Sequence, residues 1–362
     1  MRKNVALITS RRFCQSQKSG VGFVSNKISD LRTWTCPGME GGDYVNPLYH
    51  NPNYTENFTL EFRSFIDKHY NHSFEPLEIL GYIYALLYSP NYRKRYEGFL
   101  KIDYPKILFT ENEDLFRALS LLGIELIGLH VLNQESLNYS FEKLKDATIG
   151  ESGYIEVHER NPIISQNPSY NEPEKRLYIN HSAYFSGVSQ EIYDYRIGGY
   201  CVLDKYLKSH KNESCDFDHV TNIIKVIART IEIQKTLGFL TSDLPHLKGN
   251  DSEILMQEIL QNPPPPPPHL MPMSPLSYRA KPKPSETLTL IAHSSVKKQA
   301  ITTSTAEVGE QPSLYSVSPN LALICDRGSK VSPISNLFVT NKLCDLHVNG
   351  SGSYAFLLYR LT

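Results

Sequence analysis

The sequence predicts an α+β fold that is mainly helical, with a small β-sheet near the N-terminus. Three observations support this: short alternating apolar stretches before residue 50, apolar residues at helical spacing from Thr59 onward, and a proline-rich region after residue 250. The chain has 362 residues, of which 40% are apolar, which is enough to bury a core. We expect a globular part over residues 1–250, a disordered linker over 251–319 and a further apolar part over 320–362.

The globular part begins with strands. Apolar residues alternate over Val5–Thr9 and Phe23–Ile28, and polar, basic loops join these stretches. The segment Asn46-Pro47-Leu48-Tyr49 then comes close to the NPPY motif with which DNA adenine methyltransferases hold a flipped base. The residues before it show no strand, glycine-rich turn and helix of the kind that binds a cofactor. We therefore interpret the segment as an X-Pro turn that leaves a strand.

Helices follow. Thr59 is a good N-cap for a helix whose apolar face holds Phe62, Phe65, Ile66 and His69. The next helix should begin near Pro76 and stop at Ser89-Pro90. A third helix carries a leucine stripe that is expected to be core: Leu115, Leu119, Leu122, Leu126 and Leu129.

Two strand-like stretches, "GYIEV" and "RLYIN", precede two more predicted helices. The first helix lies in "GYCVLDKYLKSHK" and places Val202, Leu203, Tyr206 and Leu207 on one side. The second has a stripe of β-branched residues from Val220 to Ile231, and Gly238 is predicted as its C-cap.

The last two parts differ sharply in composition. Residues 251–319 contain six consecutive prolines, Pro263 to Pro268, and a Ser/Thr/Lys-rich run, so an extended or disordered linker is expected. Residues 320–362 partly repeat the N-terminal strands of residues 4–49. "NVALIT" recurs as "NLALIC", "FVSNKISDL" as "FVTNKLCDL" and "YVNPLY" as "YAFLLY". Strands are therefore expected at Leu321–Cys325 and Leu337–Leu343.

Charge and cysteine content narrow the class of protein. The net charge is only −1, but basic residues gather in residues 1–34 and again between Arg93 and Lys106, which suits an anionic partner. The six cysteines are scattered without CxxC pairs, so no zinc site is expected. The N-terminus lacks a signal peptide, and no apolar run approaches the roughly 20 residues of a membrane span. We expect a reducing, cytoplasmic setting and no membrane partner.

Long blocks of the sequence resemble a known family. "NPLYHNPNYTENFTLEFRSFIDKHYNHSFEPLEILGYIYALLYSPNYRKRYEGFLKIDYPKI" and "RLYINHSAYFSGVSQEIYDYRIGGYCVLDKYLK" closely resemble the C-terminal specificity domain of type ISP restriction-modification enzymes, and the resemblance covers about residues 2–240. Members of this family join an endonuclease, an ATP-driven translocase and an adenine-N6 DNA methyltransferase to a target-recognition region. The chain looks like the last of these, which implies double-stranded DNA as its partner.

The resemblance also bears on cofactors and sites. Since the phosphate-loop, nuclease and NPPY motifs are missing, we expect no catalytic residues, no metal site and no cofactor here. S-adenosylmethionine, ATP and Mg²⁺ are expected only with the catalytic domains. Arg93 is expected to contact either nucleic acid or a neighbouring domain. The candidate DNA-binding residues are Arg11, Arg12, Lys18, Lys27, Arg93, Lys94, Arg95 and Lys101.

Three functional hypotheses remain open. The first is a DNA target-recognition module without catalysis of its own. The second is a fragment of a DNA methyltransferase that is active only when another chain supplies the cofactor domain. A separate methyltransferase, translocase or nuclease chain is accordingly a possible partner. The third is a non-functional remnant of a rearranged gene, suggested by the duplicated end and its low-complexity junction. The sequence therefore leaves enzymatic activity undecided.

Overall fold

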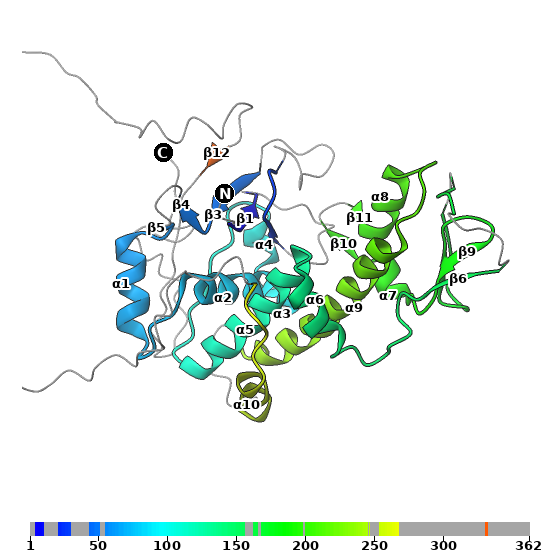
Figure 1. Cartoon of the computed structure of the whole chain (residues 1–362). Coiled ribbons are helices and arrows are strands. Elements are labelled where there is room, and N and C mark those ends of the chain that lie inside the picture. Colours follow the sequence, from blue (N-terminus) through cyan, green and yellow to red (C-terminus); the bar gives the residue numbers. More distant parts are fainter. Residues whose placement is uncertain are drawn as a thin grey trace, which may run out of the picture.

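The fold is mainly helical α+β, as predicted. Figure 1 shows the arrangement of the helices and strands. The side chains form two hydrophobic cores, and helix α9 (Phe217–Leu240) contributes to both of them. The computed structural model describes residues 4–10, 21–29, 43–50, 55–155, 162–165, 168–197, 200–244, 246, 253–267 and 330–331.

The N-terminal strands form the predicted small sheet, in the order β12-β3-β1-β2. The central strand β1 pairs antiparallel with both neighbours, and its Leu7 lies opposite Val24 and Asn46. β12 adds to the edge of β3 in parallel orientation. The predicted strands at 321–325 and 337–343 lie outside the described residues. The four strands are β1 (Ala6–Thr9), β2 (Phe23–Ser25), β3 (Tyr44–Pro47) and β12 (Lys330–Val331).

Asn46 is fully buried in this sheet. Its Nδ2 donates hydrogen bonds to the carbonyl oxygens of Leu7 (3.2 Å) and Tyr44 (3.4 Å). After Pro47 the chain leaves β3, and a second short pair forms from β4 (Tyr49–His50) and β5 (Thr55–Glu56). Asn46 and Pro47 therefore form the predicted end of a strand, and the amide of Asn46 is held by backbone.

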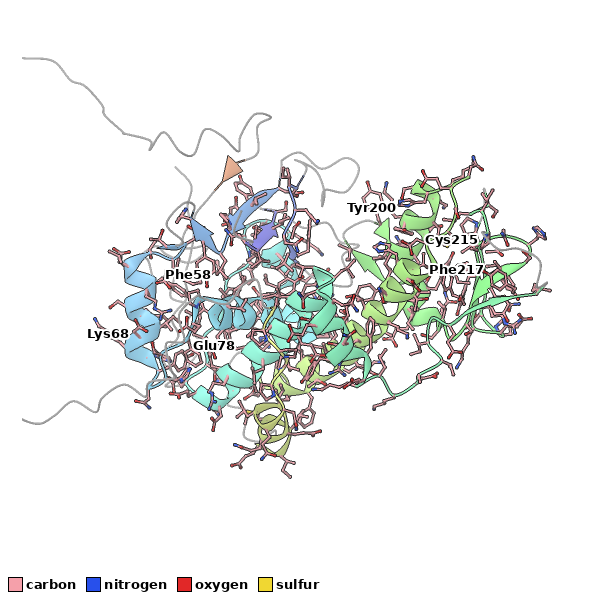
Figure 2. All side chains as sticks on the ribbon, in the orientation of Figure 1. Phe58, Lys68, Glu78, Tyr200, Cys215 and Phe217 are labelled. Carbon is pink, nitrogen blue, oxygen red and sulfur yellow. The ribbon has the colours of Figure 1, made fainter. Side chains whose placement is uncertain are left out.

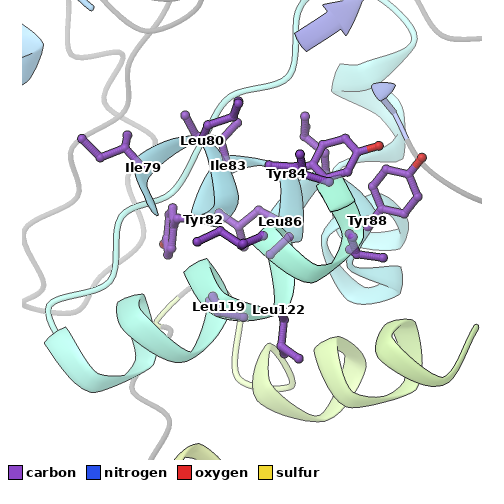
Figure 3. Close-up of a cluster of buried hydrophobic side chains, with 14 of the residues drawn as sticks. Ile79, Leu80, Tyr82, Ile83, Tyr84, Leu86, Tyr88, Leu119 and Leu122 are labelled. Carbon is purple, nitrogen blue, oxygen red and sulfur yellow. The ribbon is translucent and has the colours of Figure 1, made fainter. Parts of the chain in front are cut away.

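The first core is built on two helices that cross at very short range. α2 (Pro76–Tyr88) begins at the predicted proline, buries nearly all of its side chains and packs one face against α5 (Glu113–His130) (Figure 3). Glycine meets glycine at the crossing, because a Cβ on Gly123 would stand 1.8 Å from the carbonyl oxygen of Gly81. α1 (Leu60–His69) starts as predicted, since the Thr59 hydroxyl accepts a hydrogen bond from Phe62 N (3.2 Å).

Helix α10 (Glu253–Gln261) lies inside the segment predicted to be an extended or disordered linker, so that prediction is wrong for residues 253–261, whereas residues 262–267 form no helix or strand. α10 packs against α5, with Met256 buried and with Leu255 and Ile259 beside it on the first core. These apolar residues give the stretch a face to bury, and the neighbouring prolines obscured it in the sequence. The rest of the predicted linker, residues 268–319, lies outside the described residues.

The second core contains an antiparallel sheet that the sequence did not reveal as a unit, in the order β6-β9-β8-β7. Only its strands in "GYIEV" and "RLYIN" were expected. Its inner face buries Leu177, Ala183 and Phe185 with apolar residues of three helices. The elements are β6 (Ser152–Tyr154), β7 (Ser169–Asn171), β8 (Arg176–Tyr178), β9 (Ala183–Phe185), α7 (Gln190–Tyr193), β10 (Arg196–Ile197), β11 (Tyr200–Cys201) and α8 (Val202–Ser209).

α9 runs from one core to the other. Ile224 near its start is buried in the second core, and Leu237 near its end is buried in the first. The prediction that Gly238 caps this helix is wrong, because the helix continues to Leu240. The segment Pro90-Asn91 lies beside this glycine: Asn91 Nδ2 donates to the Gly238 carbonyl (2.6 Å), and a Cβ at position 238 would make an ordinary contact with Pro90 Cγ at 4.0 Å.

Buried polar side chains tie α9 to the first core. The Arg229 guanidinium donates to both carboxylate oxygens of Glu125, through Nε (2.7 Å) and Nη2 (3.3 Å), and Nη1 donates to Glu232 (3.0 Å). His130 forms a second link, because its Nδ1 is hydrogen-bonded to Tyr84 Oη (2.7 Å) and its Nε2 to Thr230 Oγ1 (3.0 Å).

His130 should make the fold sensitive to acid. Part of the residue reaches solvent, but both ring nitrogens are bonded inside the protein, and burial lowers the pKa of His130 from 6.5 to about 3. Between these values the unfolded chain binds a proton that the folded chain does not. The free energy of unfolding should therefore fall by about 2 kcal/mol between pH 7 and pH 5 from this group alone. Urea unfolding at both pH values measures the loss. His130→Gln should reduce it, and an unchanged pH dependence in this variant would contradict the assignment.

Among the residues that the structure describes, no single helix has both the length and the apolar character to cross a membrane. One bent pair, α5 with α6 (Gln134–Phe141), meets the criterion by length and composition only, with an angle of 116° between the two helices.

Candidate nucleic-acid interface

Most of the described candidate residues lie on or just after α3 (Pro90–Arg95), a short basic helix. Ser89 caps it, since its Oγ accepts a hydrogen bond from Tyr92 N (3.2 Å). Tyr92 is buried and anchors the helix from inside, with its hydroxyl donating to the Lys106 carbonyl (2.6 Å). The next helical positions, 93 to 95, are all basic and point in different directions, because successive residues of a helix are about 100° apart.

Arg93 faces inward. The residue is half-buried, and its Nε donates to the Ser89 carbonyl at 3.4 Å. Burial lowers the pKa of Arg93, while the nearby tyrosines Tyr195 and Tyr88 act in the opposite direction. Tyr88 belongs to the first core and Tyr195 to the second. Of the two expectations for Arg93, the geometry therefore favours contact with a neighbouring part of the protein.

Lys94 and Arg95 point outward and are exposed. They begin a stretch in which basic and apolar groups alternate on the surface. Lys106 Nζ lies 5.6 Å from the centre of the Phe99 ring, which is 48% exposed. Lys101 follows α4 (Glu97–Leu100) and is paired with Glu97 at 2.6 Å. We call this stretch the α3–α4 surface and define it by Lys94, Arg95, Phe99, Lys101 and Lys106.

The α3–α4 surface lies next to the N-terminal sheet, as Figure 1 shows for α4, β1 and β3. Tyr104 makes the contact, with its ring packed edge-on against Tyr44 of β3 at 5.1 Å. Lys27, two residues after β2, is exposed. Arg11, Arg12 and Lys18 lie outside the described residues.

Sequence reasoning missed a second group of basic and aromatic side chains, on the outer face of the sheet in the second core. The Arg176 guanidinium stacks over the Tyr184 ring at 4.2 Å, and Tyr178 packs against Tyr184 at 5.5 Å. Gly153 leaves room for this ring, because a Cβ there would lie 2.7 Å from Tyr184. Glu174 balances part of the charge by pairing with Arg176 at 3.2 Å. The signal was the two-residue period of "RLY" and "AYF", which places these side chains opposite the buried Leu177, Ala183 and Phe185.

Figure 2 shows the side chains on the ribbon, with Lys68 on α1, the exposed Tyr200 on β11 and Cys215 in the second core. Within the described ranges, no group of three or more His, Cys, Asp or Glu side chains is placed to hold a metal ion. The arrangement thus presents positive charge and exposed aromatic rings, which suit a phosphate-bearing polymer.

Comparison with known proteins assigns the family. The model described as the Type ISP C-terminal specificity domain matches residues 1–237. This is well over half of the chain, and the protein belongs to that family. No curated protein matches the chain.

Three solved structures are similar in part. The first is the ATP-dependent Type ISP restriction-modification enzyme LlaBIII bound to DNA, with 18% identity over 65% of this chain and 16% of that chain and a TM-score of 0.48. The second is a nuclease-deletion mutant of the Type ISP restriction-modification enzyme LlaGI in complex with a DNA substrate mimic, with 18% identity over 67% of this chain and 21% of that chain and a TM-score of 0.43. The third is a DrdV–DNA complex, with 17% identity over 68% of this chain and 25% of that chain and a TM-score of 0.47. The chain spans a quarter or less of the length of each of these proteins.

Proposed function

We propose that the protein is the target-recognition module of a type ISP restriction-modification system and that it binds double-stranded DNA. The family match over residues 1–237 carries this proposal. The exposed basic residues of the α3–α4 surface support it, because Lys and Arg supply most of the phosphate contacts that position a protein on a duplex.

In this proposal the three basic residues of α3 have different roles. Lys94 and Arg95 contact phosphates, while Arg93 stays between the two cores and holds α3 in place. Lys27 and Lys101 add positive charge, although the Glu97 carboxylate offsets that of Lys101. Phosphate contacts carry no sequence information, so bases must be read by other side chains in the grooves.

Catalysis belongs elsewhere in the proposed system. S-adenosylmethionine, ATP and Mg²⁺ would be bound by methyltransferase, translocase and nuclease domains, either in the same polypeptide or in a separate chain. The buried, backbone-bonded Asn46 supports this division, because a residue that holds a flipped base must face an open pocket. The alternative of a methyltransferase fragment differs only in that a partner chain restores activity.

Removal of both outward charges tests the proposal. The variant Lys94→Ala/Arg95→Ala should weaken binding to all duplexes alike, and the slope of log K against log salt should become shallower by about 0.9 for each phosphate that the protein no longer neutralises. Fluorescence anisotropy with labelled duplexes over a range of salt concentrations measures both quantities. Lys68→Ala is the matched control, since Lys68 is an equally exposed cation on α1 (Figure 2). If the double variant and the control behave alike, the α3–α4 surface is not a phosphate-binding surface.

A further inference from the structure

The repeat at the C-terminal end matches the N-terminal sheet at the positions that bury it. Leu7, Ile8, Val24 and Leu48 are between 0% and 4% exposed in the structure. All four are identical in the second copy, where they are Leu323, Ile324, Val339 and Leu358. Residues 320–362 therefore carry these four core-forming side chains in the same order as residues 4–49, and Leu321 stands at the place of the buried Val5.

The two copies also share the residues that join the first and last positions of the segment by hydrogen bonds. Asn4 joins its beginning to its end, because Nδ2 donates to the Tyr49 carbonyl (2.7 Å) and Oδ1 accepts from Tyr49 N (3.3 Å). The second copy has Asn320 and Tyr359 at these two positions. Buried positions that differ in kind include Asn46, which is Phe356 in the second copy, and Val21, which is Asn336. A phenylalanine at the place of Asn46 lacks the two hydrogen bonds that Asn46 Nδ2 donates to Leu7 O and Tyr44 O, whereas Asn46 Oδ1 has no hydrogen-bond partner to lose.

The rest of the protein holds the first copy through the apolar packing of the first core, which includes Leu7, Val24 and Leu48, and through backbone hydrogen bonds. Leu48 O accepts from Asn57 N (2.9 Å), Pro47 O accepts from Asn57 Nδ2 (2.8 Å), and Val21 N donates to Leu87 O (3.4 Å). Any chain with the same path supplies these groups. The site that receives the sheet segment, which we define by Asn57 and Leu87, therefore selects an apolar pattern and a backbone path, and both copies provide the pattern.

The second copy is also tethered close by. β12 lies between its first two matching blocks and already pairs with β3, with Lys330 opposite Tyr44 and Val331 opposite Val45. The repeat begins about 50 residues after Pro267 on the same chain. A tether of this kind keeps the local concentration of a segment in the millimolar range.

We propose that residues 320–362 can occupy the site that residues 4–49 fill, and that within one chain either segment can replace the other there. The exchange replaces the loop 10–22, with Arg11, Arg12 and Lys18, by the loop 326–337, with Asp326, Arg327 and Lys330. This change of loops would alter DNA contacts, a consequence that rests on the proposed function. The exchange itself does not.

Substitutions in the full-length chain test the exchange. One variant disables the first copy (Leu7→Asp/Ile8→Asp), a second disables the other copy (Leu323→Asp/Ile324→Asp), and a third combines all four changes. The first variant should stay folded because the second copy takes the site, the second should melt like the unaltered protein, and the combined variant should melt more than about 10 °C lower than either. If the first and combined variants melt alike, the proposal fails.

Hydrogen exchange gives the direct readout. In the variant with the first copy disabled, amides of residues 320–325 and 338–346 should become protected at least tenfold relative to the unaltered protein, while the disabled residues 4–9 lose protection. Protection that appears only in a dimer on size-exclusion chromatography, or not at all, overturns exchange within one chain. Neither measurement involves DNA, so a failure of the exchange can be distinguished from a failure of the proposed function.

Discussion

Replacement of Gly123 by alanine should unfold much of the protein. The new methyl group would stand 1.8 Å from Gly81 O and 2.4 Å from Gly81 C, and both are backbone atoms that cannot turn away. α2 and α5 would have to separate along the most extensive helix–helix packing of the first core. We expect a loss of more than about 3 kcal/mol, the upper end of the cost of overpacking a core.

Urea unfolding followed by circular dichroism measures this loss. Gly98→Ala is the matched control, since a Cβ there meets no atom within 4 Å and an alanine favours the helix by up to about 1 kcal/mol. Equal midpoints for the two alanine variants would show that the crossing of α2 and α5 is not as close as described.

Loss of Arg229 should have an effect of similar size. The side chain of Glu125 is 3% exposed and that of Arg229 is 14% exposed. Arg229→Met would leave the Glu125 carboxylate buried without its bidentate partner, and breaking a buried pair in this way costs about 3–5 kcal/mol. Since α9 contributes to both cores, we expect the loss of Arg229 to destabilise both of them.

The double variant Arg229→Met/Glu125→Leu separates charge from packing. It removes both charges, and we expect it to recover most of the lost free energy of unfolding, because apolar residues of similar volume replace a buried ion pair at little cost. Chemical denaturation of the two variants and the unaltered protein measures the recovery. A double variant that is no more stable than Arg229→Met alone would mean that the pair does not act through its buried charge.

The helices of the first core could be predicted from sequence because their signals are local. Thr59 and Pro76 start helices that the apolar period then continues, and both starts are confirmed. The second sheet could not be predicted as a unit, since its strands are three residues long and its register depends on distant partners such as Ser152 and Phe185. Gly238 shows the same limit of local signals: as a glycine it suggested a helix end, but α3 packs beside it and the helix continues.

The candidate interface was predictable only in part, for a similar reason. The basic run at residues 93–95 was visible in the sequence, but helix geometry alone did not say which of the three residues points inward. The buried Tyr92 and the nearby Tyr195 decide it, and Tyr195 comes from a distant part of the chain. The stacking of Arg176 on Tyr184 depends on the pairing of β8 with β9, which the sequence did not show.

Selection from a random pool of DNA duplexes tests the central claim most directly. The protein is incubated with the pool at low salt, bound duplexes are recovered and sequenced, and the cycle is repeated. A target-recognition module should enrich one short sequence, since each wrong base pair in a recognised site costs about 1–3 kcal/mol. Binding that leaves the recovered pool identical to the starting pool, or no binding at low salt, would contradict the claim.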